Sequence, residues 1–340
     1  MAPHLFFACC DHGIPRFQSL FADPSVISDL QDLHAGLAVA VPDLSPQRAQ
    51  IVRRLNAAGI PLIAWIELPG AGGPYLNAGD ATREVTYTAA FERWTFQNHL
   101  HWAGVGLDIE PSFTELVRLR GHPWRIARLV LSRYFDYARV YRARKASTRL
   151  IRQLQREGYL VQTYQLPFIV AERSIHSTLL ERLLGIVDVR GNQEALMVYS
   201  SLARGAGTGM IYRLGLNAQA IVIGVTEADP SAGPLGIPLH WAGFSRDLIV
   251  ASHFTRTVGV YNLEGSVQQG FLARLKTFDW SQSALIPASS MQRAARVSRD
   301  IRIALVIGSL LPALIAILLL LLAGIVWRWH GCRPRIKSTA

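Results

Sequence analysis

The sequence alternates short apolar runs with longer amphipathic segments as far as residue 278. Apolar runs of this length are typical of parallel strands buried on both faces. In one intervening segment, Pro46 near the start and Gly59 after the end are typical helix boundaries. The expected strands cover residues 4–10, 36–41, 60–68, 104–110, 159–168, 195–199, 218–226 and 258–263. Eight strands, each with a returning segment, predict a fold of the α/β class, a (β/α)8 TIM barrel, over residues 1–280.

A doubly wound open sheet is the alternative arrangement of alternating strands and helices. Open sheets that bind dinucleotides carry a G-x-G-x-x-G fingerprint, which this sequence lacks. The glycine-rich stretch 70–79 is followed by no Lys-Ser or Lys-Thr pair, so we interpret it as a loop beside a substrate rather than a phosphate cradle. The barrel is therefore the favoured fold.

The most informative expected strand is 104–110, in which Asp108 and Glu110 stand two positions apart and Pro111 follows. Residues two apart in a strand point to the same side, so both carboxylates face one cavity. Two such acids oppose each other's ionisation, and the less solvated one has a pKa raised toward neutrality. The pattern predicts a general acid. The alternative is an ordinary strand end whose acids face water or cap the next helix.

The other expected strand ends also carry acids, amides and aromatic residues. Barrel enzymes place their reacting groups at these ends. On the fifth strand, Gln162, Tyr164 or Gln165 is expected to face the cavity, and Gln165 stands nearest the end. The strand-end candidates that we retain besides Asp108 and Glu110 are Asp11, Glu67, Gln165, Tyr199, Glu227, Asn262 and Glu264.

This mixture of residues suits a carbohydrate ligand. Carboxylates can protonate a glycosidic oxygen, and the rings of Trp65, Trp241 and Tyr75 offer flat apolar faces for sugar rings. The alternative is that these aromatic residues belong to the core. The sequence has no nucleophile-elbow serine, no C-x-x-C and no H-E-x-x-H, so we expect no metal and no cofactor.

Two short motifs resemble the chitinase-type glycoside hydrolases of family 18. Members carry D-x-x-D-x-D-x-E on the fourth strand and M-x-Y-D on the sixth, matched here by Asp108, Glu110 and the run from Met197 to Tyr199. The resemblance implies that Glu110 is the general acid, that Asp108 orients the N-acetyl group of the substrate, and that Tyr199 hydrogen-bonds that group. The sequence departs from the family pattern at Ala103, Gly106 and Ser200, where the family has aspartates.

A second resemblance is to the large clan of retaining glycosidases with an acid/base on strand four and a nucleophile on strand seven. Glu110 followed by Pro111 matches the first position and Glu227 the second, although Ile109 stands where an asparagine normally precedes the acid. That mechanism needs carboxyl groups about 5 Å apart. A third hypothesis is an inactive barrel that binds a glycan or a protein partner at a membrane.

Residues 303–326 form an apolar run without a charged residue, long enough to cross a bilayer core of ~30 Å. Trp327 and Trp329 follow where interfacial aromatic residues are common. We therefore predict a polar and basic linker at 281–302, a single C-terminal transmembrane helix at 303–327 and a basic tail at 328–340. Arginines flank the span on both sides, so the side of the membrane stays open. The N-terminal apolar run is short and has no lysine or arginine before it, so we interpret it as a strand rather than a signal peptide and expect the barrel to lie in the cytosol.

The formal net charge of +11 raises the possibility of nucleic-acid binding. The region 118–156 gathers many arginines, and residues 124–157 are expected to form a long amphipathic helix, either continuous or broken near Ala146 and Ser147. It has no nucleic-acid recognition pattern, so we interpret it as a solvated face or as a contact with anionic lipid beside the anchor. The expected partners are a carbohydrate and a lipid bilayer, with nucleic acid unlikely.

Overall fold

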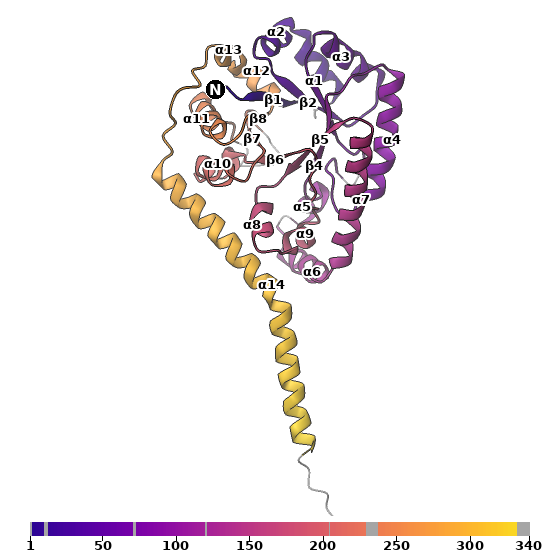
Figure 1. Cartoon of the computed structure of the whole chain (residues 1–340), viewed down its shortest axis with the longest axis vertical. Coiled ribbons are helices and arrows are strands. Elements are labelled where there is room, and N and C mark those ends of the chain that lie inside the picture. The colour runs from indigo at the N-terminus through magenta and orange to yellow at the C-terminus, as the bar shows by residue number, and fades with distance from the viewer. Residues whose placement is uncertain are drawn as a thin grey trace, which may run out of the picture.

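The computed structural model describes residues 2–9, 13–70, 73–119, 121–203, 205–228 and 237–331, with residues 81, 82, 113 and 312–331 described by their backbone alone. Within these ranges, eight parallel strands close into a barrel in sequence order (Figure 1). They are β1 (His4–Cys9), β2 (Gly36–Val41), β3 (Leu62–Ile66), β4 (Gly104–Ile109), β5 (Leu160–Gln165), β6 (Gln193–Met197), β7 (Ala220–Gly224) and β8 (Thr257–Tyr261). The predicted barrel is confirmed.

Helices surround the strands (Figure 1). They are α1 (Ile14–Ala22), α2 (Pro24–Asp32), α3 (Pro46–Ala57), α4 (Ala81–Gln97), α5 (Phe113–Leu119), α6 (Pro123–Arg133), α7 (Tyr137–Arg156), α8 (Ile169–Ser174), α9 (Leu179–Leu184), α10 (Gly207–Gly215), α11 (Trp241–Ser252), α12 (Leu263–Gln268), α13 (Phe271–Lys276) and α14 (Ala288–Gly331), with a short 3-10 helix at Ser200–Leu202. Local capping explains several starts. Ser45 accepts a hydrogen bond from the backbone N–H of Arg48 at the start of α3, where Pro46 occupies the first turn.

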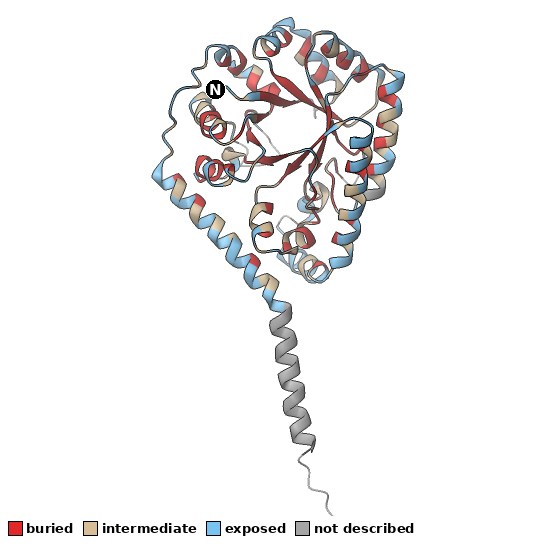
Figure 2. Ribbon diagram, in the orientation of Figure 1, coloured by how far each residue is buried: buried red, intermediate tan, exposed pale blue. Residues whose placement is uncertain are grey.

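The core has two layers, because each strand is buried on both faces (Figure 2). One layer lies between the strands and the helices and includes Phe7, Val39 and Val105. The other fills the barrel and includes Phe6 and Trp65. Neighbouring residues of a strand enter different layers, so the period of two decides which side chains reach the barrel interior.

The helix expected at residues 124–157 is divided at residues 134–136, whereas Ala146 and Ser147, the predicted place of a break, lie inside the continuous helix α7. Between α6 and α7 the chain turns at residues 134–136, and the Asp136 side chain accepts a hydrogen bond from the N–H of Arg139 to cap α7. Asp is a strong helix-starting residue, since its carboxylate satisfies a free N–H of the first turn. The turn leaves α6 as a separate, largely exposed helix at one corner of the barrel (Figure 2).

Helix α14 lies along the outside of the barrel, past α10 and α8 (Figure 1). The Ser290 hydroxyl accepts a hydrogen bond from the Gly209 N–H of α10 at 3.0 Å, and Ala294 and Leu305 are buried. Among residues described with their side chains, which end at Leu311, no helix is long and apolar enough to cross a membrane. The predicted span at 303–327 extends past that limit, and the tail at 328–340 lies outside it.

Candidate active site

The carboxylates of strand β4 lie at the end of the strand, as their spacing predicts. Asp108 is 3% exposed and lines the barrel interior, and Glu110 directly follows the strand, near enough for its charge to raise the pKa of Asp108. The loop after β3 lies against this end, since Leu76 donates to the carbonyl of Asp108 at 2.8 Å and accepts from the N–H of Glu110 at 3.2 Å. This loop, interpreted from the sequence as lying beside a substrate, therefore borders both acids and carries Tyr75.

The two carboxyl groups have raised pKa values. Burial raises the pKa of Asp108 well above its usual range, and the charges of Glu110 and Glu67 raise it further. Burial raises the pKa of Glu110 to about 7. Burial also raises the pKa of Tyr199, helped by the charges of Asp108 and Glu110. Glu110 is therefore suited to hold a proton near neutral pH and to release it during a reaction.

Two buried polar atoms lie next to the cavity, one on Trp65 and one on Asp108. The indole N–H of Trp65 lies near enough to Asp108 to lower its pKa slightly. Neither that nitrogen nor Oδ1 of Asp108, however, makes a well-formed hydrogen bond with any described residue. Buried polar atoms are normally paired, and an unpaired one is costly.

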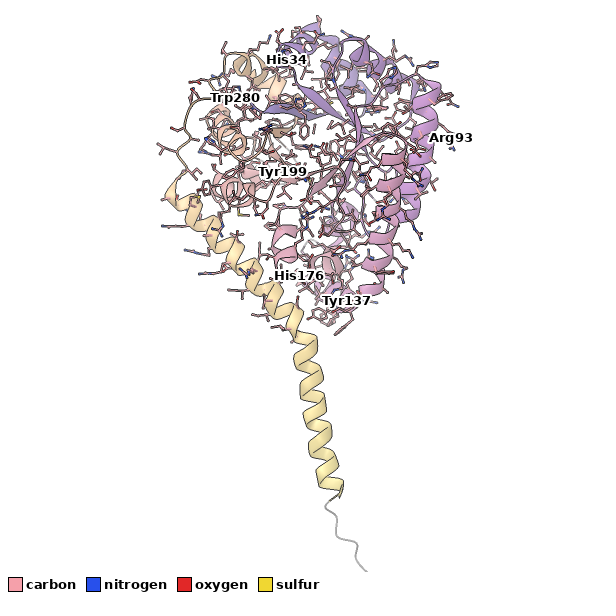
Figure 3. The ribbon with its side chains drawn as sticks, viewed as in Figure 1. His34, Arg93, Tyr137, His176, Tyr199 and Trp280 are labelled. Atoms are coloured by element: carbon pink, nitrogen blue, oxygen red, sulfur yellow. The ribbon has the colours of Figure 1, made fainter. Side chains whose placement is uncertain are left out.

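Aromatic rings enclose the space next to Asp108. Trp65 packs against Tyr164 and Tyr261, with ring centroids 6.5 Å and 6.3 Å apart, and Tyr199 (labelled in Figure 3) packs against Tyr261 at 5.5 Å. The cavity that these rings line has a volume of ≈ 20 Å³. This volume holds about one water molecule, so a sugar ring would bind above the cavity, toward the carboxyl ends of the strands.

Glu67 and Tyr199 are thus close neighbours of the two acids. Glu227, in contrast, contacts a different set of residues. Glu227 follows β7 and forms an ion pair with Arg16 of α1. Its Oε2 accepts a hydrogen bond from Nδ2 of Asn262 at 3.2 Å. The side-chain oxygen of Asn262 also caps α12, accepting from the Gly265 N–H at 3.0 Å. Glu264 is 7% exposed in the first turn of the same helix. Asp11 lies outside the described residues.

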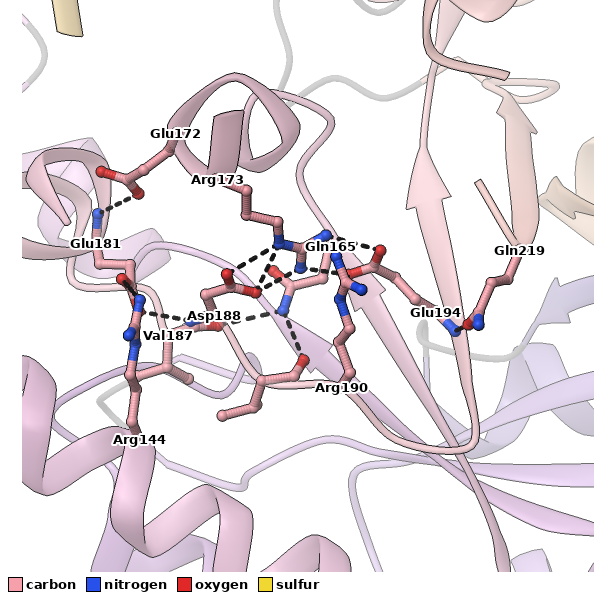
Figure 4. A network of polar contacts seen from close by, with 11 residues as sticks. Arg144, Gln165, Glu172, Arg173, Glu181, Val187, Asp188, Arg190, Glu194 and Gln219 are labelled. Atoms are coloured by element: carbon pink, nitrogen blue, oxygen red, sulfur yellow. Dashed lines mark hydrogen bonds and ion pairs between the residues drawn. The ribbon is translucent and has the colours of Figure 1, made fainter. Parts of the chain in front are cut away.

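Gln165 does not face the barrel interior, and its assignment to the site is corrected. Its side-chain nitrogen donates to the carbonyls of Val187 and Val189, at 3.2 Å and 3.1 Å (Figure 4). The neighbouring Tyr164 lines the cavity instead. The register of β5 places the even positions inside, and the sequence offered polar or aromatic residues on both faces of the strand end.

Trp241 is also outside the site. It begins α11 and packs against Phe244, Phe271 and Phe278, with ring centroids 5.8, 5.4 and 5.7 Å apart, beneath the guanidinium of Arg274. These partners come from α11, α13 and the chain after α13, so Trp241 is part of the helix layer. These contacts favour the alternative that Trp241 is a core residue and does not bind a sugar.

Tyr261 is a cavity residue that the sequence analysis missed. It ends β8, and its ring contacts both Trp65 and Tyr199. A signal was present, because alternation along the eighth strand places Gly259 and Tyr261 on one face.

The fold and the site define a (β/α)8 barrel with a cluster of carboxylates and aromatic rings at the ends of its strands. No protein-family model matches the chain, and no curated protein does. Among solved structures, the glycoside hydrolase domain of PgaB (BpsB) from Bordetella bronchiseptica is similar, with a TM-score of 0.52 and 10% sequence identity, over 83% of this chain and 100% of that domain. At this identity the similarity shows a shared barrel fold.

Proposed function

We propose that the protein is a membrane-anchored glycoside hydrolase that uses Glu110 as its general acid/base. The observation that carries the proposal is that Glu110, whose pKa is about 7, lies near enough to Asp108 of the aromatic-walled cavity for its charge to raise the pKa of Asp108. The fold shared with a solved glycoside hydrolase domain supports the same class. The substrate class is a glycan.

The roles follow from the chemistry of each group. Protonated Glu110 would donate its proton to the glycosidic oxygen as the bond to the leaving sugar breaks. Asp108, which lines the cavity, would orient the acetamido group of a 2-acetamido sugar. The ring of Tyr199 would lie beside the same sugar. After departure of the leaving group, Glu110 would accept a proton from the attacking water.

The test is turnover of aryl glycosides, with and without an N-acetyl group, by the full chain in detergent. Glu110→Gln should lower kcat by about 10² to 10⁴ and leave the affinity for ligand unchanged, because the glutamine amide has the shape of the carboxyl group but no transferable proton. Glu84→Gln is the matched control, since it removes a buried carboxyl with a raised pKa from the first turn of α4 instead of the barrel mouth. Unchanged turnover by Glu110→Gln would remove this residue from the mechanism.

A glycan-binding barrel without turnover is the second candidate. One observation favours it: the contacts that Glu227 makes with Arg16 and Asn262. Saturable binding of an oligosaccharide, with no product released by the wild-type chain and equal binding by Glu110→Gln, would establish this function in place of hydrolysis.

We also propose that residues 303–327 anchor the barrel in a bilayer. The support is the uncharged apolar run at 303–326 and the flanking Trp327 and Trp329. The full chain should float with lipid vesicles and resist extraction by alkali. Leu318→Arg should weaken this association, because a charge at the middle of a span costs about 3 kcal/mol. Release of the wild-type chain by alkali would refute the anchor.

A further inference from the structure

Helix α6 presents an exposed apolar face at one corner of the barrel. Trp124, Leu131 and Phe135 are 81%, 76% and 60% exposed. Trp124 and Leu131 are seven positions apart, so they share one side of the helix, and Arg128 falls between them on that side. The opposite side carries Arg133, which is buried. Large side chains exposed together in this way mark an interaction surface.

The same segment is strongly basic. Residues 116–135 contain five arginines and no aspartate or glutamate. Arg133 is compensated by Glu115, to which it donates at 2.7 and 2.8 Å. Arg118, Arg125 and Arg128 are exposed. A helix with Trp, Leu and Phe on one side and arginines around them is typical of helices that lie in the interface of an anionic membrane.

Helix α14 approaches this corner where it leaves the barrel (Figure 1). The hydroxyl of Tyr134 donates to the carbonyl of Gly308, and the hydroxyls of Ser177 and Ser309 are 2.7 Å apart. Tyr137, at the start of α7, lies in the same part of the molecule (Figure 3). The end of α6 is thereby held at the level of residues 308–309, where the proposed membrane segment begins to separate from the barrel.

We infer that the α6 face, defined as Trp124, Arg125, Arg128, Leu131 and Phe135, lies on an anionic lipid surface. The apolar side chains would enter the headgroup boundary and the arginines would pair with lipid phosphates. Two attachments, α14 and the α6 face, would then fix the tilt of the barrel on the membrane. The inference rests on the anchor proposed above and is independent of the reaction at Glu110.

Photocrosslinking of the full chain in vesicles tests the apolar part. A benzophenone amino acid replaces Trp124 in one protein and Phe96 in another. Phe96 is the matched control, since it is also aromatic and 81% exposed. It lies near the end of α4, on the side of the barrel where Arg53 of α3 donates a hydrogen bond to the carbonyl of Asn98, and not beside α6. In vesicles containing phosphatidylglycerol, position 124 should form lipid adducts and position 96 should not. Equal adduct yields, or adducts of position 124 with a second protein chain, would overturn the inference.

The arginines are tested by lipid composition. Each basic residue near an anionic surface contributes about 1 kcal/mol, or roughly fivefold in binding. Arg125→Gln with Arg128→Gln should therefore reduce the adduct yield at position 124 in phosphatidylglycerol vesicles toward that in pure phosphatidylcholine. Arg149→Gln with Arg152→Gln, on the exposed face of α7, is the control and should leave the yield unchanged. An equal effect of both pairs would refute specific docking through α6. Flotation after alkali treatment reports on the anchor separately.

Discussion

A Cβ atom at Gly106 would lie 2.8 Å from Cε2 of Tyr164. Gly106 stands where the family 18 pattern has an aspartate, so in this barrel an aromatic ring occupies the space beside Asp108. The Tyr164 hydroxyl donates to Oε1 of Gln162 at 2.7 Å, which holds the ring in place. The packing partner of Gly106 in this barrel is thus a tyrosine of the neighbouring strand.

Gly106→Ala should lower the free energy of unfolding by about 1–3 kcal/mol, because the added methyl group overpacks the barrel interior. Chemical denaturation of the full chain in detergent measures this. Gly243→Ala, in α11, is the control, since its Cβ would meet a side-chain atom no nearer than 3.4 Å. That change should be neutral or stabilising by up to about 1 kcal/mol. Equal stabilities of Gly106→Ala and the wild type would contradict the packing argument.

The pH dependence of turnover should follow Glu110. A general acid acts in its protonated form, so kcat/KM should fall as pH rises above about 7, tenfold per pH unit. Since burial sets the pKa of Glu110, Glu67→Gln should leave this descending limb in place. A rate that rises through neutral pH would show that Glu110 acts first as a base.

Glu227→Gln should reduce kcat far less than Glu110→Gln. Oε1 of Glu227 is engaged by Arg16 and Oε2 by Asn262, so the group is held as a structural partner in the free protein. The comparison is made on one aryl glycoside at one pH. A loss as large as that of Glu110→Gln, together with a glycosyl ester trapped on Glu227 of the wild-type chain, would instead assign Glu227 as the nucleophile of a retaining enzyme.

Glu84→Gln should flatten the dependence of stability on pH. Burial, helped by the charge of Asp80, raises the pKa of Glu84 from 4.5 to about 8. Between these values the unfolded chain has released the proton that the folded chain keeps. The free energy of unfolding therefore falls as pH rises, by up to about 1.4 kcal/mol per unit. Chemical denaturation at several pH values measures the free energy of unfolding of the variant and of the wild type. If the two free energies change with pH in parallel, Glu84 does not contribute to the pH dependence.

The sequence by itself determined the barrel and the two acids at the end of its fourth strand. Both depend on local periodicity: the apolar runs are buried on two faces, and the period of two puts Asp108 and Glu110 on one side. Covalent geometry fixes that period, so the side to which each strand residue points can be predicted without knowing which other strands or helices lie beside it.

Only the tertiary structure decided which aromatic and polar residues join those acids. Tyr164 rather than Gln165 faces the cavity because the register of β5 selects one face, and Trp241 packs with Phe271 and Phe278 because α11 and α13 meet. Tyr134 likewise joins Gly308, more than a hundred residues away in the chain. Such contacts depend on side chains brought together by the closed fold, and no local pattern records them.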